Sequence, residues 1–283
     1  MITSGTALAI LTPWYSPQTG LLLAVLAVVG ARVIYFRNMG HCPPELRLRR
    51  KGLDYLLAGK ADKAEECFRT CLATCETPDR VRPLVCLADA LIDQGRYEES
   101  QEYLRRALEL GDPTGSGQGS MADLLLKTAV DPEKALDMAE QSMELTIGMP
   151  RNVVYFGGGV YDDLKRAKCW ARKAQALVQL NRQTEAHQAI DRAVRLVENA
   201  HKEERQVRPR NSLLVMLVIG SRRLSSHREL ALAVVHWQLG LAFLATDDST
   251  KAIEHFRITR DTDHRGKYRR LAQQKIQQLE SRR

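Results

Sequence analysis

"ADKAEECFRTCLATCE" spans residues 61–76, and its interpretation decides the fold class of the chain. Cys67, Cys71 and Cys75 recur at every fourth residue, which places the three thiols on one side of a helix. Metal ligands have this arrangement, and so do small residues that pack in a helical core. The spacing alone leaves both interpretations open, so the neighbouring sequence must choose between them.

A second stretch repeats the first at a constant offset of 36 residues. Residues 52–72 read "GLDYLLAGKADKAEECFRTCL", and residues 88–108 read "ADALIDQGRYEESQEYLRRAL". The corresponding residues are Gly59 and Gly95, Ala64 and Ser100, Phe68 and Leu104, and Cys71 and Ala107. Small residues let two helices approach closely, a large apolar residue fills the space between them, and glycine ends a helix in a left-handed conformation. The pattern predicts repeated helix-turn-helix units.

The two stretches resemble the tetratricopeptide repeat, a helix-turn-helix unit of about 34 residues. Three later segments fit the same pattern less closely, namely residues 122–145, 170–194 and 237–256. Their second-helix anchors continue the series Ala64, Ser100, Ala135, Ala186 and Ala252. The resemblance implies an all-α fold, a tetratricopeptide-type α-solenoid, and the alternative is a helical bundle without repeats. Few segments favour strands, because only 6% of the residues are aromatic and long stretches are rich in Ala, Leu, Glu, Lys and Arg.

Within this pattern the cysteines become core residues, because Cys71 takes the place that Ala107 fills in the next unit. Zinc sites usually show closely spaced Cys pairs or Cys and His partners, and neither is present. Two alternatives stay open: a four-thiol site completed by Cys86, or a redox role for Cys67, Cys71, Cys75 and Cys86. The seven histidines form no metal-binding motif, and His236 is expected to pack in the core.

The segment "TGLLLAVLAVVGARVIYF", residues 19–36, predicts a transmembrane helix before the repeats. Its length is close to the roughly 20 residues that a bilayer requires, and Trp14, Tyr15 and Tyr35 fit the interfacial aromatic pattern. Lys and Arg are absent before the segment and frequent after it, so the positive-inside rule predicts a cytosolic repeat region with the N-terminus outside. Which membrane is involved is left open. A cleaved signal peptide is the competing interpretation, with "VGA" at 29–31 as its cleavage site.

The expected organisation alternates repeats with irregular segments. The series is a short extracytoplasmic N-terminus (1–18), the transmembrane helix (19–36), a juxtamembrane linker (37–44), three repeats (45–146), a glycine-rich connecting loop (147–164), a fourth repeat (165–198), a basic and apolar insertion (199–228), a fifth repeat (229–264) and a basic amphipathic capping helix (265–283). These insertions raise the question of whether the repeats form one continuous solenoid.

Two segments outside the repeats are candidate sites. In "FGGGVYDD", Gly157, Gly158 and Gly159 could approach an anion, and Asp162 and Asp163 could hold a cation or a basic partner. A phosphate-binding loop requires a preceding strand, and the Walker form also requires a Lys-Ser/Thr pair that this segment lacks, so a connecting loop is the preferred interpretation. An enzyme using this loop is the least favoured function.

The second candidate is the basic C-terminal third, which carries the whole net charge of +8. Residues 201–283 contain 17 Lys and Arg against 9 Asp and Glu, whereas residues 1–200 contain 25 of each kind. Arg208, Arg210, Arg222 and Arg223 flank an apolar run and form the candidate basic surface. This charge could attract anionic lipid or, less favourably, nucleic acid, whereas the bland alternative is a solvated face.

The resemblance implies that the first helices line a concave groove that binds protein or peptide segments. Arg49, Tyr55 and Asp89 are the candidate groove residues. Family members that hold acidic C-termini use a clamp of Lys and Asn residues, but the corresponding places here carry Arg49, Leu53 and Cys86, which disfavours that ligand. The expected function is a membrane-anchored adaptor or scaffold without catalytic residues, cofactor, metal or small-molecule substrate.

Overall fold

The computed structural model describes residues 44–75, 80–148, 158–207, 221–264 and 266–281, together with Gly30. The chain divides into two compact units, residues 1–42 with 208–224 and residues 43–207 with 225–283. The helix pairs discussed below belong to the second unit, to which α12 contributes from Ser225 onward.

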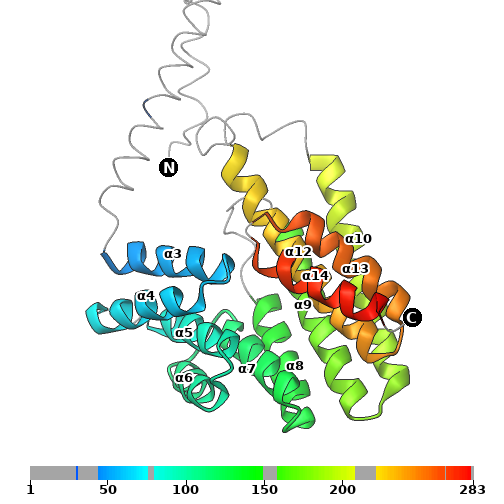
Figure 1. The fold of residues 1–283 in the computed structure, drawn as a ribbon, viewed down its shortest axis with the longest axis horizontal. Coiled ribbons are helices and arrows are strands. Elements are labelled where there is room, and N and C mark those ends of the chain that lie inside the picture. The colour runs from blue at the N-terminus through cyan, green and yellow to red at the C-terminus, as the bar shows by residue number, and fades with distance from the viewer. Residues whose placement is uncertain are drawn as a thin grey trace, which may run out of the picture. The chain divides into compact units, whose positions relative to one another are not determined.

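The described residues form eleven α-helices and no strand (Figure 1). The helices are α3 (Pro44–Leu57), α4 (Ala61–Thr74), α5 (Val81–Asp93), α6 (Tyr97–Glu109), α7 (Ser116–Thr128), α8 (Pro132–Gly148), α9 (Gly158–Gln179), α10 (Gln183–Val207), α12 (Ser221–Ala245), α13 (Ser249–Thr262) and α14 (Lys267–Glu280). They form five pairs of a first and a second helix, α3 with α4, α5 with α6, α7 with α8, α9 with α10 and α12 with α13, followed by α14. The predicted all-α fold of helix-turn-helix units is confirmed.

Four of the five pairs have the same turn between their helices. The second residue after the first helix is left-handed in each of them, namely Gly59 (φ 69°), Gly95 (φ 79°), Asn181 (φ 59°) and Asp247 (φ 61°). In the first turn, the amide of Lys60 donates to the carbonyl of Tyr55 over 2.9 Å, and the amide of Gly59 donates to that of Leu56 over 3.0 Å. The other three turns have equivalent bonds, which together form the Schellman motif. The left-handed role of Gly59 was predicted from sequence, whereas Asn181 and Asp247 take over the same position without glycine.

The second-helix anchors are completely buried in all five pairs. Ala64, Ser100, Ala135, Ala186 and Ala252 each have 0% exposure. Four of them have only a methyl side chain, and the Ser100 hydroxyl donates a hydrogen bond to the carbonyl of Ala88 over 3.1 Å. The burial of every anchor confirms the repeat pattern, including the units that matched it less closely.

In the first and last pairs, glycine on the first helix makes room for phenylalanine on the second. A Cβ atom at Gly52 would lie 2.7 Å from the Phe68 ring, and one at Gly240 would lie 2.5 Å from the Phe256 ring. Both phenylalanines are completely buried. Because real Cβ atoms do not approach other atoms so closely, any larger residue at either glycine would separate the two helices.

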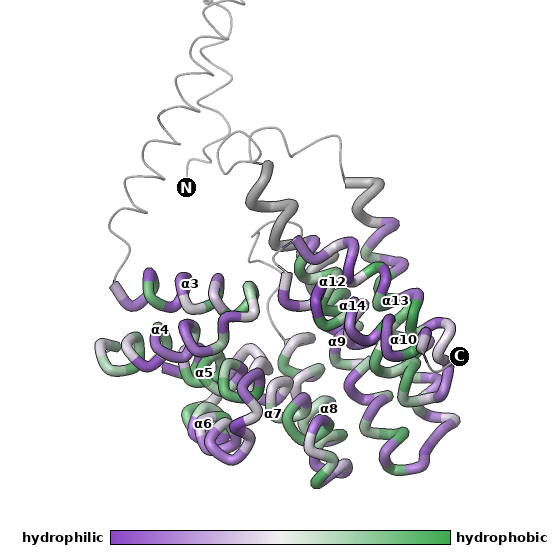
Figure 2. The backbone as a smooth tube through the Cα atoms, viewed as in Figure 1, coloured by the Kyte–Doolittle hydropathy of each residue, from purple (hydrophilic) through white to green (hydrophobic). Residues whose placement is uncertain are grey.

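Each helix pair packs against the next pair in the chain. The second helix of each of the first three pairs contacts the first helix of the next pair, as α4 contacts α5, α6 contacts α7 and α8 contacts α9. Val197 and Ala200 of α10 share a core cluster with Val235 and Leu239 of α12, which links the fourth pair to the fifth. Apolar and polar stretches alternate along each helix, as expected of helices with one buried side (Figure 2). The five described helix pairs therefore pack in one series, from the first pair to the fifth.

Two predicted segments differ from the observed boundaries. The connecting loop was expected to extend to residue 164, but α9 already begins at Gly158. The insertion was expected over residues 199–228, but α10 continues to Val207 and α12 begins at Ser221. In both places the helices are longer than the repeat pattern. Because the expected boundaries followed that pattern, they made these helices too short.

None of the helices in the described ranges has both the length and the hydrophobicity that a bilayer-spanning helix needs. The predicted transmembrane segment, residues 19–36, lies outside the described residues except for Gly30. The residues of the expected extracytoplasmic N-terminus, 1–18, also lie outside them. The transmembrane helix therefore stays a prediction.

The close contact between Gly240 and Phe256 gives a first testable prediction. We expect Gly240→Val to lower the free energy of unfolding by about 1–3 kcal/mol, because the added side chain overlaps the buried ring. The second substitution Phe256→Leu in the same chain should restore part of the loss, since a smaller side chain leaves room for valine. Urea unfolding followed by circular dichroism measures both variants, and an additive loss in the double variant would contradict the proposed contact.

Candidate functional site

An ion pair between a buried arginine and a half-buried aspartate joins the first helices of the third and fourth pairs. The Arg172 guanidinium of α9 donates two hydrogen bonds to the Asp123 carboxylate of α7, over 2.7 Å from Nε and 2.5 Å from Nη2. The Arg172 side chain is only 5% exposed. Burial by itself raises the pKa of Asp123, but the Arg172 guanidinium outweighs this effect and holds the pKa below its usual value. The pair is therefore ionised at neutral pH.

Two glutamines extend this ion pair to the first helix of the fifth pair. The Gln238 amide of α12 donates to Asp123 over 3.2 Å, and the Gln175 amide of α9 donates to the Gln238 side-chain oxygen over 3.0 Å. Gly119 of α7 provides the space for the guanidinium, because a Cβ atom there would lie 2.4 Å from Arg172 Nη1. One polar network thus connects three consecutive first helices.

Asp89 of α5 belongs to the same polar region. Burial raises the pKa of Asp89, and the Ser120 side chain and the charges of Lys168 and Lys267 act in the opposite direction. For Lys168 of α9, burial and the Arg172 charge lower the pKa. We call Asp89, Asp123, Lys168, Arg172 and Gln238 the first-helix polar cluster. It contains two acidic and two basic side chains, so it has mixed charge.

The last helix reaches the first two pairs at the edge of this cluster. Lys267 Nζ at the start of α14 lies 2.5 Å from Asp93 Oδ2 at the end of α5. One turn later, Arg270 donates to the carbonyl of Ala58, directly after α3, over 2.9 Å. Ala272, Ile276 and Leu279 of α14 are buried in the core of the fifth pair. The predicted capping helix therefore covers the last repeat and also contacts the first.

The three candidate groove residues lie in two different places. Arg49 and Asp89 both act on the pKa of the Cys86 thiol, which places them in one neighbourhood. Tyr55 packs instead against the core of the first two pairs, with the ammonium groups of Lys51 and Lys63 at 5.8 and 5.9 Å from its ring. Of the three, only Asp89 belongs to the first-helix polar cluster.

The glycine-rich candidate loop is helical over most of its length. Gly158 and Gly159 form the start of α9, and Asp162 and Asp163 follow within its first two turns. Asp163 lies 3.9 Å from Arg166 one turn later in the same helix. Gly157 lies outside the described residues, and the side chain of Asp162 is not among those described. The interpretation of residues 158–163 as a connecting loop was wrong, and their helical backbone also differs from a phosphate-binding loop.

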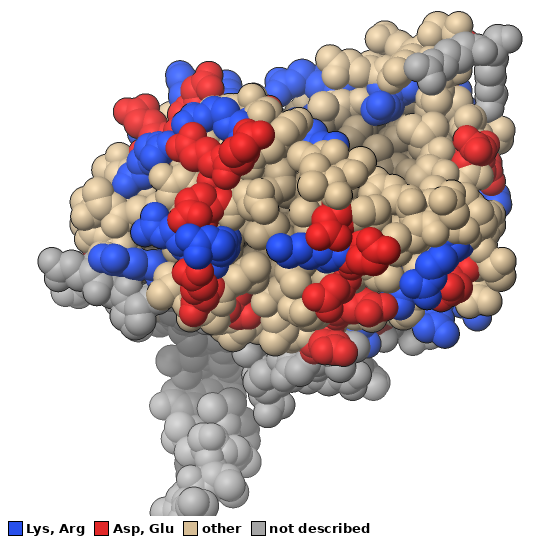
Figure 3. Space-filling view, turned by 90° about the horizontal axis from the view of Figure 1, so that it is seen from below, with Lys and Arg blue, Asp and Glu red and all other residues tan. Residues whose placement is uncertain are grey.

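The candidate basic surface falls largely outside the described structure. Arg208 and Arg210 are not among the described residues, and Arg222 and Arg223 are described only as part of the α12 backbone. Several basic side chains further along the C-terminal third are paired with acids. These pairs are Lys251 with Asp248, Arg257 with Glu280, and Arg260 with Asp261. Acidic and basic side chains are also interspersed on the face shown in Figure 3.

The cysteines of the opening sequence are core residues, as predicted. Cys67, Cys71 and Cys75 are 8%, 1% and 4% exposed, and all three are free thiols. Burial and the nearby Asp89 carboxylate raise the pKa of the Cys86 thiol to about 12, so this thiol is protonated at neutral pH and is a poor nucleophile. Within the described part of the chain, no group of three or more His, Cys, Asp or Glu side chains could hold a metal ion.

A pair of histidines lies in the core of the fifth helix pair. His236 Nδ1 of α12 is 2.8 Å from His255 Nδ1 of α13, so one ring donates its proton and the other accepts it. The Phe243 ring stacks on His255, with the ring centroids 5.1 Å apart. Burial, reinforced by His255 and His201, lowers the pKa of His236 to about 3, and burial also lowers that of His255. His236 is therefore a neutral core residue, as the sequence predicted.

Sequence reasoning missed most of the first-helix polar cluster. Lys168 and Arg172 are spaced four residues apart in α9, and Asp123 interrupts an apolar part of α7. The sequence did contain one signal for this cluster, namely a charged residue among the apolar residues of a first helix. Its partners could not be identified, because they lie up to 115 residues apart in the chain.

Residues 81–112, which cover α5, α6 and the three residues after α6, match the family model described as a tetratricopeptide repeat. A comparison with curated proteins gives no match. Among solved structures, the one titled "MamA RS-1 ArsTM double mutant" is 16% identical with a TM-score of 0.42, and the match covers 80% of this chain and 97% of that one. A tetratricopeptide repeat protein from Parabacteroides merdae is 14% identical with a TM-score of 0.33, and the match covers 83% and 98%. The family match agrees with the turns and buried anchors described above.

The Asp123–Arg172 pair yields a second prediction. We expect Asp123→Ala to lower the free energy of unfolding by about 2–3 kcal/mol, because it leaves a buried guanidinium without its carboxylate. The double variant Asp123→Ala with Arg172→Met removes both charges, so its free energy of unfolding should fall by less than that of the single variant. Urea unfolding of the two variants distinguishes these outcomes, and equal or greater loss in the double variant would contradict the role of the ion pair.

The histidine pair predicts that stability falls in mild acid. Unfolded His236 binds a proton below about pH 6.5, whereas folded His236 binds one only near pH 3, so acid favours the unfolded state between these values. From this histidine alone we expect a loss of about 2 kcal/mol between pH 7.5 and pH 5. Urea unfolding across this range should show a shallower pH dependence for His236→Leu than for the parent chain. Parallel curves for the two proteins would exclude His236 as the cause.

Proposed function

We propose that this tetratricopeptide repeat protein is a membrane-anchored scaffold that binds protein or peptide segments on the face formed by its first helices. Residues 19–36 would hold it in a membrane, with the repeats on the cytosolic side. The binding itself requires no chemical step. Tetratricopeptide repeats typically act as scaffolds for protein interaction, and the match over residues 81–112 is the observation that carries this assignment.

The first-helix polar cluster supports the choice of binding face. Consecutive first helices of such repeats lie on one side of the solenoid, and here α5, α7, α9 and α12 bring polar side chains together on that side. Asp89 and Lys168 keep part of their surface exposed. Polar groups that are partly exposed and held by neighbours can bind a peptide without a large ordering cost.

The mixed charge of the cluster favours a segment with both acidic and basic side chains. A clamp for a free acidic C-terminus requires several positive charges, whereas here Asp89 lies in the same neighbourhood as Arg49. Its carboxylate, when ionised, would repel a terminal carboxylate. The sequence also argues against such a clamp, because Leu53 and Cys86 stand at two of the places where the clamp has Lys or Asn residues.

Support for the membrane anchor comes from the sequence. Residues 19–36 are apolar except for Arg32, and basic residues follow them. The positive-inside rule then places the repeats in the cytosol. The abundance of free cysteines agrees with a reducing compartment.

Crosslinking in intact cells tests the binding face. A photoreactive amino acid at Arg49 or Lys168, on first helices, should capture partner proteins from the full-length chain. The same probe at Lys134, an exposed residue of the second helix α8, serves as the control. The expected result is a set of adducts shared by the first two positions and absent from the third.

The same cells test the anchor through a second, independent measurement. The full chain should stay with the membrane in alkaline carbonate, and a variant without residues 19–36 should be released. Adducts at Lys134 that equal those at Arg49 and Lys168 would contradict the binding face. Release of the full chain by carbonate would contradict the anchor without affecting the binding result.

A further inference from the structure

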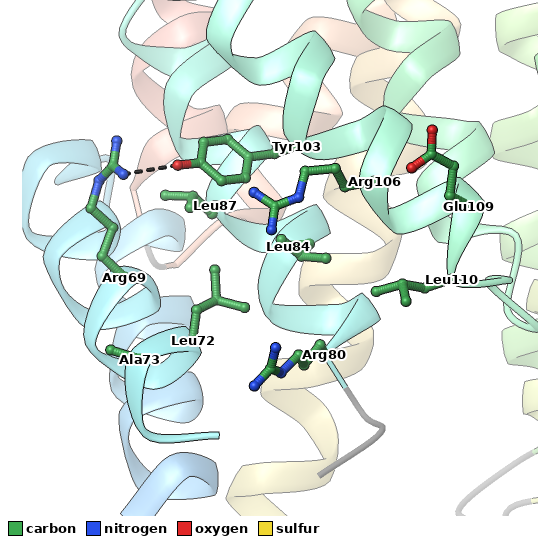
Figure 4. A pocket seen from close by; sticks show the side chains of 10 residues that line it. All are labelled: Arg69, Leu72, Ala73, Arg80, Leu84, Leu87, Tyr103, Arg106, Glu109 and Leu110. Carbon is green, nitrogen blue, oxygen red and sulfur yellow. Dashed lines mark hydrogen bonds between the residues drawn. The ribbon is translucent and has the colours of Figure 1, made fainter. Parts of the chain in front are cut away.

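A pocket of about 510 Å³ lies between the first two helix pairs (Figure 4). Its lining comes from α4, α5 and α6 and from the residues directly before α5 and after α6, Arg80 and Leu110. None of its residues belongs to α7, α9 or α12, which supply most of the polar cluster. On α5, Leu84 and Leu87 line the pocket, whereas Asp89 belongs to the cluster. The pocket is therefore a second surface, distinct from the face that the proposed function uses.

The floor of this pocket is apolar. Leu84 and Leu87 of α5 form its centre, and Leu72 of α4 lies beside them (Figure 4). Leu110, directly after α6, is 57% exposed at the pocket's edge. An exposed leucine next to a leucine-lined hollow gains free energy when an apolar side chain covers it.

Three arginines surround the apolar floor. In Figure 4 the guanidinium groups of Arg69, Arg80 and Arg106 approach it from three sides. Arg69 is held in place by Glu65 at 2.8 Å, by Glu99 at 2.6 Å and by the Tyr103 hydroxyl at 2.9 Å. These carboxylates offset its charge, so Arg69 serves mainly to fix the Tyr103 side of the pocket.

Arg80 and Arg106 differ from Arg69 in their partners. Arg80 donates two hydrogen bonds to the carbonyl of Cys75, over 3.2 and 2.9 Å. Arg106 lies over the Tyr103 ring, 5.9 Å from its centroid. Within the ranges that the structure describes, neither guanidinium forms an ion pair with a carboxylate. Among the described residues, no carboxylate therefore offsets the charge of either guanidinium.

Among the described residues of the lining, Glu109 is the only acidic one. Its carboxylate points away from the leucines in Figure 4 and lies 2.6 Å from Arg105, which is not part of the pocket. The pocket therefore combines an apolar floor with an excess of positive charge at its rim.

We propose that this pocket binds a peptide segment of a partner protein in which a large apolar side chain stands next to an aspartate or glutamate. The apolar side chain occupies the hollow over Leu84 and Leu87, and the carboxylate accepts hydrogen bonds from Arg106 or Arg80. Charge-assisted bonds of this kind are stronger than neutral ones, and the arginine fork matches a carboxylate. The protein then has two binding surfaces, one on its first helices and one between α4 and α6.

A short fluorescent peptide with two leucines flanked by aspartates is a direct probe of the full chain in detergent or nanodiscs. We expect saturable binding measured by fluorescence anisotropy. Replacing the leucines by serines keeps the charge, and replacing the aspartates by lysines keeps the apolar groups. Each change should weaken binding about tenfold or more, because each removes one of the two interactions.

Two protein variants locate the probe. Arg106→Glu reverses the charge at the rim, and Leu110→Ser removes an exposed apolar group, so each should weaken binding about tenfold while the circular dichroism spectrum stays unchanged. The matched control is Arg195→Glu, an exposed arginine on the second helix α10 with the same change in net charge. It should bind the probe like the parent chain.

Four outcomes would overturn the proposal. They are no binding of the acidic peptide at millimolar concentration, equal binding of the lysine peptide, an equal loss in Arg195→Glu, or unchanged affinity in both pocket variants. A chain that is dimeric by sedimentation and becomes monomeric with Leu110→Ser, without binding the probe, would identify a second copy as the occupant instead. Crosslinking at Arg49 and Lys168 reports on the other face, so either result can fail without the other.

Discussion

The close approach of two helices within a repeat is the constraint on which the remaining structure depends. In the first and last pairs, glycine on the first helix lies directly against a phenylalanine ring on the second, with no room for a Cβ atom. The completely buried small anchors impose the same proximity in all five pairs. A single pair cannot bury its apolar surface alone, so each pair stacks on the next.

Stacking places the first helices beside one another, and this arrangement explains the polar cluster. A charged side chain such as Arg172 is costly to bury unless a carboxylate and further hydrogen-bonding groups receive it. Asp123 and Gln238 fulfil this condition from the neighbouring first helices. The same residues therefore couple adjacent repeats and give the proposed binding face its mixed charge.

The pocket between α4 and α6 lies where the first two helix pairs stack on each other. Leu84 and Leu87 of α5 close the bottom of this hollow and are themselves buried, whereas Leu110 at its edge is 57% exposed. Arginines can cover the apolar surface around such a hollow with the aliphatic part of their side chains, while their guanidinium groups stay in water. If both proposals hold, the chain has two binding surfaces of different chemistry, one of mixed charge and one that is apolar with a basic rim.

The sequence by itself determined the helix-turn-helix units, the small anchors, the left-handed glycines and the core position of the cysteines, because these depend on contacts within one repeat. The helix that replaces the loop after Gly158 and the polar partners of Arg172 were not predictable, since they depend on packing between repeats. Asn181 and Asp247 illustrate the same limit, because the turn geometry that favours Gly59 also accepts residues whose short polar side chains tolerate a left-handed backbone. Tertiary structure alone brought Lys267 to Asp93 across 174 residues, because only the stacking of all five pairs sets where the last helix meets the first.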